Sequence, residues 1–519
     1  MDDKNKLVER FYNDYYLGDH IKRCRIKKIE FDKQGYFVFS KINQIDDYKD
    51  FDEYIKHFSK QFFKENLNID LLDKSDSLAI DKAMSSILYP FILNIDRLKI
   101  LDSAITEEQA INIFGISISD IYDITGLIIL RVLIYNDYIY RKNMTSNDRM
   151  IFFGTTKPTC WFSAKEINIL NKDIELECIK KYLELFSVEL EDVSTVEDTK
   201  KIIKAENNYI LMYLGEFCTY IFNECEKLII EYFKNLKDNK LDSYYKKRGK
   251  SFEKYVRNIL RNIYDDVITN AKYIDDKSRK MKLDNLIIKD DICINFECKS
   301  SGFNIYNAHN DTETMMNMKK AFGRGYFSID TFHRTLEKNE GGIELEIENK
   351  KQQFNLKDKK VISFNITLYP VEFLSTSIHF FDKEIKDSIS VFPITINVID
   401  LHSIILLSNI NKELFEIYAK ERFFSINNIK KFKIDYDEID AFGYVTDDSL
   451  NNGYKMMKKL ANVNPNVEQH IMINNSAYRK EVNAILASFG VYVLVDELLD
   501  VDLKRVFEKI FPKNEKTNS

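Results

Sequence analysis

The pattern of apolar and polar positions changes character along the chain. Residues 24–42 alternate apolar and polar side chains on either side of DKQG, which predicts an early β-hairpin. From about 45 to 237, apolar residues recur at three- and four-residue spacing, and a long helix is expected from about Val196 to Lys234. Strand and helix patterns alternate afterwards. We therefore expect a mostly helical first half and a mixed second half.

The second half begins after a polar stretch at residues 234–251. Interleaved strands and helices then indicate a mixed sheet, so the expected fold class is a multi-domain α+β or α/β protein. The expected elements are helix 251–265, strands 283–288 and 292–299, helix 312–338, strands 361–369 and 389–399, and helix 411–422. The expected domains are 1–237, mostly α-helical with the early hairpin; 244–446, a mixed sheet flanked by helices; and 447–519, a helical tail with one strand conceivable at GVYVLVDE.

Composition limits the classes of protein that fit this pattern. The chain has 519 residues, 45% of them hydrophobic, so it is folded and too long for a single core. Its formal charge of −6 is small, so contact with nucleic acid would depend on a local basic patch. The seven cysteines are scattered and form no C-x-x-C pair, which argues against disulfides and a zinc knuckle and favours a reducing cytoplasm.

A membrane partner is not expected. No apolar leader follows Met1, and the most apolar run, GLIILRVLIY from Gly126, is interrupted by Arg131 and too short to cross a bilayer. We expect this run to be a buried helix.

The candidate chemistry lies in LDNLIIKDDICINFECKS, residues 283–300. Side chains alternate across a strand, so Glu297 and Lys299 share one face of the second strand. If Asp290 and Asp291 form a two-residue turn, the antiparallel register sets Asp284 opposite Glu297, whereas a three-residue loop would shift it by one residue. The other interpretation is a surface hairpin with solvated charges, but neither face of this hairpin is plainly polar.

Two carboxylates opposed across a strand pair repel each other unless a cation or a shared proton lies between them. Magnesium suits such a site because it prefers carboxylate oxygens and keeps several waters. Lys299 is placed to act on a metal-bound water or on a phosphate charge. Glu253, on the preceding helix, lies at the edge of an apolar stripe and leans toward the sheet; taken alone, it would be read as a solvated residue.

This set of residues resembles the PD-(D/E)XK nuclease superfamily, whose fold is restriction-endonuclease-like. In that superfamily the D…(D/E)-x-K residues lie on adjacent antiparallel strands after a helix that often carries a Glu, and the matching residues are Glu253, Asp284, Glu297 and Lys299. The likeness covers about residues 248–340. Leu283 stands where the motif's name has Pro, and IDTFHRTLEKN lacks the Gln often found on the following helix.

The resemblance implies metal-dependent hydrolysis of phosphodiester bonds, by an endonuclease or exonuclease. Asp284 and Glu297 would hold one or two Mg²⁺, with Mn²⁺ as a substitute and the backbone carbonyl of Cys298 as a further ligand. Lys299 would assist the attacking water, and Glu253 would bind a second metal ion or orient the first ligands.

The expected substrate is nucleic acid, with DNA favoured over RNA, and the expected role is bacterial antiviral defence or restriction. A homo-oligomer or a partner protein of a defence system fits this role. The alternative is a non-catalytic or partner-activated nucleic-acid-binding or scaffolding protein on a nuclease-like fold. Basic residues near the motif are candidates for phosphate contact, although a solvated face explains any one of them equally well: Lys250, Lys282, Lys319, Lys320 and Arg324.

Overall fold

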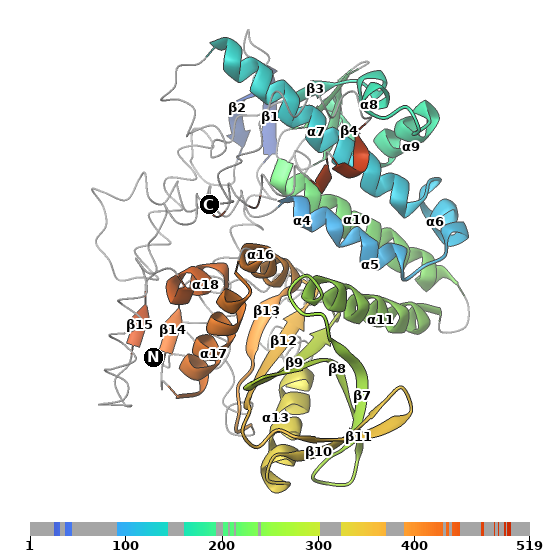
Figure 1. The fold of residues 1–519 in the computed structure, drawn as a ribbon. Coiled ribbons are helices and arrows are strands. Elements are labelled where there is room, and N and C mark those ends of the chain that lie inside the picture. Colours follow the sequence, from blue (N-terminus) through green and yellow to red (C-terminus); the bar gives the residue numbers. More distant parts are fainter. Residues whose placement is uncertain are drawn as a thin grey trace. The chain divides into compact units, whose positions relative to one another are not determined.

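The structure is a computed structural model. It describes residues 25–31, 37–43, 91–143, 160–193, 201–205, 208–211, 214–236, 240–301, 323–369, 389–409, 411–428, 432–434, 438–446 and 469–471, with a few positions between 482 and 499. The chain divides into two compact units, residues 16–244 with 476–519, and residues 1–15 with 245–475. Each unit combines helices with a sheet (Figure 1), so the mixed α and β class is confirmed.

The unit of residues 16–244 and 476–519 contains the early hairpin and a helical region. Strands β1 (Arg25–Phe31) and β2 (Phe37–Asn43) pair antiparallel, as the alternating pattern predicts. A four-stranded sheet has the order β3-β6-β5-β4. The bounds are α4 (Phe91–Asp96), α5 (Leu98–Asp102), α6 (Glu107–Phe114), α7 (Ile118–Asn143), β3 (Cys160–Phe162), α8 (Ala164–Leu170), α9 (Leu176–Phe186), β4 (Ser187–Glu189), β5 (Ile202–Ala205), β6 (Asn208–Leu211) and α10 (Leu214–Asn235).

The long helix expected from Val196 to Lys234 is wrong in its first part. Strands β5 and β6 occupy residues 202–211, and α10 begins only at Leu214. Runs such as IIKA and NYIL are too short for their apolar spacing to separate a strand from a helix. At the other end of the chain, the described residues within GVYVLVDE are helical and do not form a strand.

The apolar run from Gly126 lies in α7, and its described side chains from Leu127 to Leu130 are buried, as expected. Arg131 forms an ion pair with Glu166 at 3.0 Å between Nη2 and Oε1. Within the described part of the chain, no single helix has the length and apolar character to cross a membrane, although the bent pair Glu107–Phe114 and Ile118–Val132 passes the same test together.

The unit of residues 245–475 is built on a seven-stranded sheet of order β11-β10-β7-β8-β9-β12-β13. Strand β8 is antiparallel to β7 and β9, whereas β12 is parallel to β9 and β13, so the sheet is mixed. The bounds are β7 (Ile268–Ile274), β8 (Lys280–Lys289), β9 (Ile292–Lys299), β10 (Gly342–Ile347), β11 (Lys350–Asn355), β12 (Lys360–Thr367) and β13 (Ile394–Asn397); two short strands, β14 (Phe432–Ile434) and β15 (Gln469–Ile471), pair separately.

Helices cover both faces of this sheet (Figure 1). On one face, Phe332 of α13 packs in a core cluster with Leu286 and Cys293 of the central strands. On the other face, Phe415 of α17 stacks near Phe296 and Phe364, with ring centroids 6.5 and 5.8 Å away. The helices are α11 (Lys240–Leu260), α13 (Arg324–Lys338), α16 (Val398–Ser408), α17 (Glu413–Asn428) and α18 (Glu438–Thr446).

The structure adds to the expected elements and shortens one of them. The polar stretch 234–251 is largely the first half of α11. Strand β7, the β10–β11 hairpin and α16 were not among the expected elements. The strand expected at 389–399 is only β13, because Asn397 caps α16 by accepting hydrogen bonds from the amides of Ile399 and Asp400.

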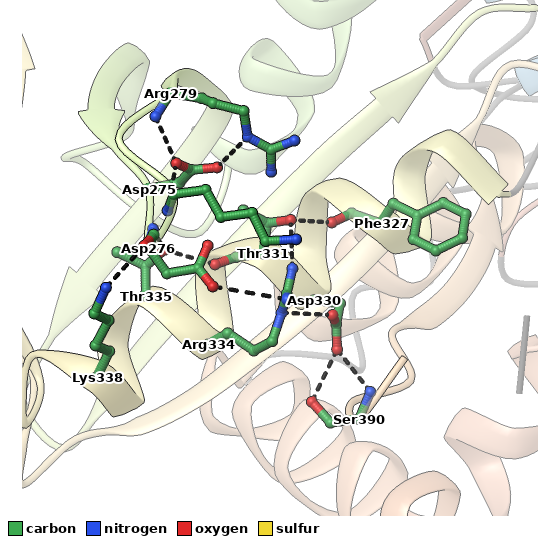
Figure 2. A network of polar contacts seen from close by, with 11 residues as sticks. Asp275, Asp276, Arg279, Phe327, Asp330, Thr331, Arg334, Thr335, Lys338 and Ser390 are labelled. Carbon is green, nitrogen blue, oxygen red and sulfur yellow. Dashed lines mark hydrogen bonds and ion pairs between the residues drawn. The ribbon is translucent and has the colours of Figure 1, made fainter. Parts of the chain in front are cut away.

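A polar network joins α13 to the β7–β8 turn (Figure 2): Lys338 of the helix donates to the backbone carbonyl of Asp276 in the turn at 2.8 Å. Asp275 closes the turn by accepting from the backbone and Nε of Arg279, at 2.6 and 2.7 Å. On α13, Arg334 pairs with Asp330 at 3.0 Å, and Asp330 accepts from the amide and hydroxyl of Ser390. This network anchors α13 on the face of the sheet that carries Glu297.

Candidate functional site

The β8–β9 hairpin has the register that the sequence predicts for a two-residue turn. Lys289 pairs with Ile292, and the ladder runs back to the pair Asn285 and Phe296. Asp290 takes a φ of +40° in the turn, a conformation that Asp tolerates better than most residues. The charged residues of interest therefore lie at the far end of this hairpin.

Asp284 lies where the regular pairing of β8 with β9 stops, one residue beyond the pair Asn285 and Phe296. Its side-chain Oδ2 accepts the backbone N–H of Cys298 at 2.9 Å, in place of a backbone carbonyl of β8. Because the amide and carbonyl of a strand residue point to the same side, the carbonyl of Cys298 also points toward β8. On the other side of Asp284, the β7 residue Asn270 interrupts the ladder with a φ of +53°. Such uncommon backbone conformations concentrate at functional sites.

Glu297 and Lys299 form an ion pair on the face of β9 that α13 covers. The ammonium of Lys299 contacts Oε1 of Glu297, and Glu297 as a whole is only 5% exposed. Its Oε2 is buried and has no hydrogen-bond partner among the described residues. A buried carboxylate oxygen without a partner is costly, so this atom is a candidate ligand for a cation.

Lys282 connects Glu253 to the site. Its Nζ lies 2.6 Å from Oε2 of Glu253 and 3.1 Å from Oδ1 of Asp284. Glu253 thus leans toward the sheet, as its position on the helix predicts, but reaches Asp284 through an ammonium group. Together with Glu297 and Lys299, these residues form a cluster of three carboxyl groups and two ammonium groups. The acidic groups outnumber the basic ones, so an additional cation would be attracted to the cluster.

Burial and neighbouring charges shift the pKa values of the cluster. Burial raises the pKa of Glu297 to about 7, with Lys299 opposing the rise and Asp284 adding to it. Burial and then the charge of Asp284 raise the pKa of Glu253. Burial alone would lower the pKa values of Lys282 and Lys299, but their carboxylate neighbours outweigh it and both values are raised. Both lysines are therefore ammonium ions at neutral pH.

The donors fit a hard divalent cation that keeps much of its water. Asp284, Glu297 and the Cys298 carbonyl offer oxygen ligands, and magnesium is usually held by one or two carboxylates plus waters. In the described ranges no three His, Cys, Asp or Glu side chains come close enough to hold a metal ion by themselves. Zinc or a transition-metal centre built wholly from side chains is therefore not what these residues offer.

Two buried asparagines surround Glu297 without partners of their own. Asn295 lies two residues before Glu297 on β9, and Asn365 is its register partner on β12. No polar side-chain atom of either asparagine has a hydrogen-bond partner among the described residues. Gly325 of α13 permits this packing, because a Cβ there would lie 2.2 Å from Oδ1 of Asn365 and 3.2 Å from Cε of Lys299.

Gly325→Ala is therefore expected to lower the free energy of unfolding by about 1–3 kcal/mol, since the added methyl group overpacks the contact with Asn365 and Lys299. Thermal or urea unfolding measures this change. Gly323→Ala is the matched control, because a Cβ there meets nothing within 4 Å, and it should cost less than about 1 kcal/mol. Equal stability of the two variants would contradict the packing described here.

The candidate phosphate contacts fall in different places. Lys250 is exposed and lines a hollow of about 250 Å³ together with Lys254 and Arg257, whose spacing puts all three on one face of α11. Glu253 and Asp284 line the same hollow.

Of the remaining candidates, Lys282 lies within the carboxylate cluster, and Arg324 is exposed at the start of α13. Lys319 and Lys320 lie outside the described residues. Sequence reasoning missed Lys254 and Arg257, although their spacing from Lys250 was visible, and it missed Asn365, for which no local signal exists.

No family model, no curated protein and no solved structure matches the chain. What the site can do must be inferred from its own residues.

Proposed function

We propose that this protein is a metal-dependent nuclease of the PD-(D/E)XK kind, acting on DNA in preference to RNA, with a role in bacterial antiviral defence or restriction. The observation that carries the proposal is the group formed by Asp284, Glu297 and Lys299 at the end of the β8–β9 hairpin, where Glu297 keeps one buried oxygen without a described partner. The helix that bears Glu253 precedes these strands, as in that superfamily.

Asp284, Glu297 and the carbonyl of Cys298 would hold a Mg²⁺ ion. When bound, such an ion lowers the pKa of a coordinated water and neutralises charge on a phosphate oxygen. Lys299 is held by Glu297 and has a raised pKa, which favours orienting water and stabilising negative charge over accepting a proton. The basic face of α11 beside the site would attract the phosphate backbone.

The second candidate function is a nucleic-acid-binding or scaffolding protein that uses the nuclease-like fold without catalysis or only with a partner. The small number of side-chain metal donors among the described residues favours it. The two candidates differ in one observable, the metal-dependent breakage of phosphodiester bonds.

Removal of divalent metal tests the proposal directly. Purified protein is incubated with plasmid, single-stranded DNA and RNA in Mg²⁺, Mn²⁺ or EDTA, and the products are resolved on gels. We expect DNA cleavage with Mg²⁺ or Mn²⁺ and none with EDTA, because without a bound cation the two carboxylates would repel the phosphate and no metal-bound water would be activated. Cleavage that persists in EDTA would exclude the metal mechanism, and binding without cleavage would favour the scaffold.

The affinity for Mg²⁺ should rise with pH. Glu297 has a pKa of about 7, and only its ionised form is a good ligand, so protons compete with metal more strongly at pH 6 than at pH 8. We expect binding about ten-fold tighter at pH 8, measured by titration calorimetry. Asp284, Lys282 and Lys299 are the charged groups that act on this carboxyl. Equal affinity at the two pH values would argue against Glu297 as a ligand.

A further inference from the structure

The ammonium group of Lys282 lies between two carboxylates, those of Glu253 and Asp284. Its ammonium lies 2.6 Å from Glu253 and 3.1 Å from Asp284, and these are contact distances for charge-assisted hydrogen bonds. The two acids come from different elements, α11 and β8, and share this single cation. Nothing in the motif itself requires a lysine two residues before the aspartate.

The other half of the cluster is arranged differently. Lys299 contacts only Oε1 of Glu297, and Oε2 of the same carboxylate has no partner among the described residues. Asp284 uses one oxygen for Lys282 and the other for the amide of Cys298, but a carboxylate has about four acceptor positions and can still bind an ion. The buried carboxylate oxygen of the cluster that still lacks a described partner, and that a cation could contact, is therefore Oε2 of Glu297.

A divalent ion that bridged Glu253 and Asp284 would need the position that the ammonium group of Lys282 already fills, and the charge of Lys282 opposes a second cation there. We propose that Lys282 is a resident cation that takes the place of a second metal ion, so that the site binds one divalent ion, on the Asp284 and Glu297 side. Glu253 is then a positioning residue for Lys282 and not a metal ligand. This inference rests on the proposed function and chooses between the one-metal and two-metal alternatives that the sequence leaves open.

The test counts Mn²⁺ ions per chain by the electron paramagnetic resonance signal of free Mn²⁺ during a titration. The wild-type protein should bind one ion, Lys282→Met should bind two, and Lys282→Met combined with Glu253→Gln should return to one. Lys272→Met is the matched control, because Lys272 is the register partner of Lys282 on β7 and is similarly exposed, but pairs with Glu346; it should leave the count at one.

Two outcomes would overturn the inference: two ions bound by the wild-type protein, or an unchanged count in a folded Lys282→Met variant. If that variant does not fold, Glu253→Gln decides: it should leave the count at one, and a count below one would show that Glu253 is a metal ligand and would overturn the inference. A wild-type protein that binds no Mn²⁺ would instead refute the metal site of the proposed function. A wild-type count of zero therefore refutes the proposed function, whereas a wild-type count of two, or an unchanged count on substitution, refutes only the role of Lys282.

Discussion

Asp284→Asn is expected to reduce the kcat/KM for DNA cleavage by at least about 10²–10³-fold, the loss typical when a group that stabilises transition-state charge is removed. The carboxamide is nearly the same size as the carboxylate and can still accept the backbone N–H of Cys298 through its oxygen. The strand end should therefore keep its geometry. What the substitution removes is the negative charge that would bind the metal ion.

Asp290→Asn is the matched control for this substitution. Asp290 lies in the turn of the same hairpin, its side chain is 79% exposed, and its positive φ suits asparagine equally well. Cleavage rate and melting temperature should both stay at the wild-type level in this control. If Asp284→Asn retains more than about a tenth of wild-type activity while remaining folded, Asp284 does not bind an essential metal ion.

The geometry of this hairpin could be predicted because every signal that sets it is local. The two-residue turn at Asp290 and Asp291 fixes the pairing of Lys289 with Ile292, and strand alternation then fixes which residues share a face with Glu297. The mixed α and β class followed from a separate signal, the alternation of strand and helix patterns along the chain. The register of the hairpin could be predicted because a short turn joins its two strands.

The surroundings of Glu297 could not be predicted, because they come from distant parts of the chain. Asn365 is set beside Glu297 by parallel pairing of β12 with β9, and Gly325 meets both through the packing of α13. Neither carries a local signature. Lys282 is an intermediate case: its shared strand face with Asp284 is visible in the sequence, but its contact with Glu253 depends on how α11 lies on the sheet.

Local reasoning also failed where short segments are ambiguous. The apolar spacing before α10 fitted a helix, yet β5 and β6 form there because their residues pair with each other and with flanking strands. Likewise, the apolar run from residue 389 onward continues from β13 directly into α16. The cap at Asn397 was the available signal for that change, since Asn begins helices readily.

Glu438→Gln should lower the free energy of unfolding by about 3–5 kcal/mol, the typical cost of breaking a buried ion pair from one side. Glu438 and Arg422 are 0% and 1% exposed, and the guanidinium contacts both carboxylate oxygens at 2.8–3.2 Å. Tyr418 donates a further hydrogen bond to the same carboxylate at 2.7 Å. A neutral amide would remove the carboxylate charge that now faces the buried guanidinium of Arg422.

This loss should reach the candidate site through α17. The helix carries Phe415, which stacks on Phe296 and Phe364, the residues next to Glu297 and Asn365 on the opposite face of the sheet. Asp291→Asn is the matched control, because it breaks the exposed pair between Lys420 of the same helix and Asp291, and exposed pairs contribute at most about 1 kcal/mol. Urea unfolding of both variants, followed by circular dichroism, measures the difference. If both variants lose the same small amount of unfolding free energy, the Arg422–Glu438 pair does not hold α17 to α18. The helices packed on β9 and β12 would then be held by their aromatic contacts.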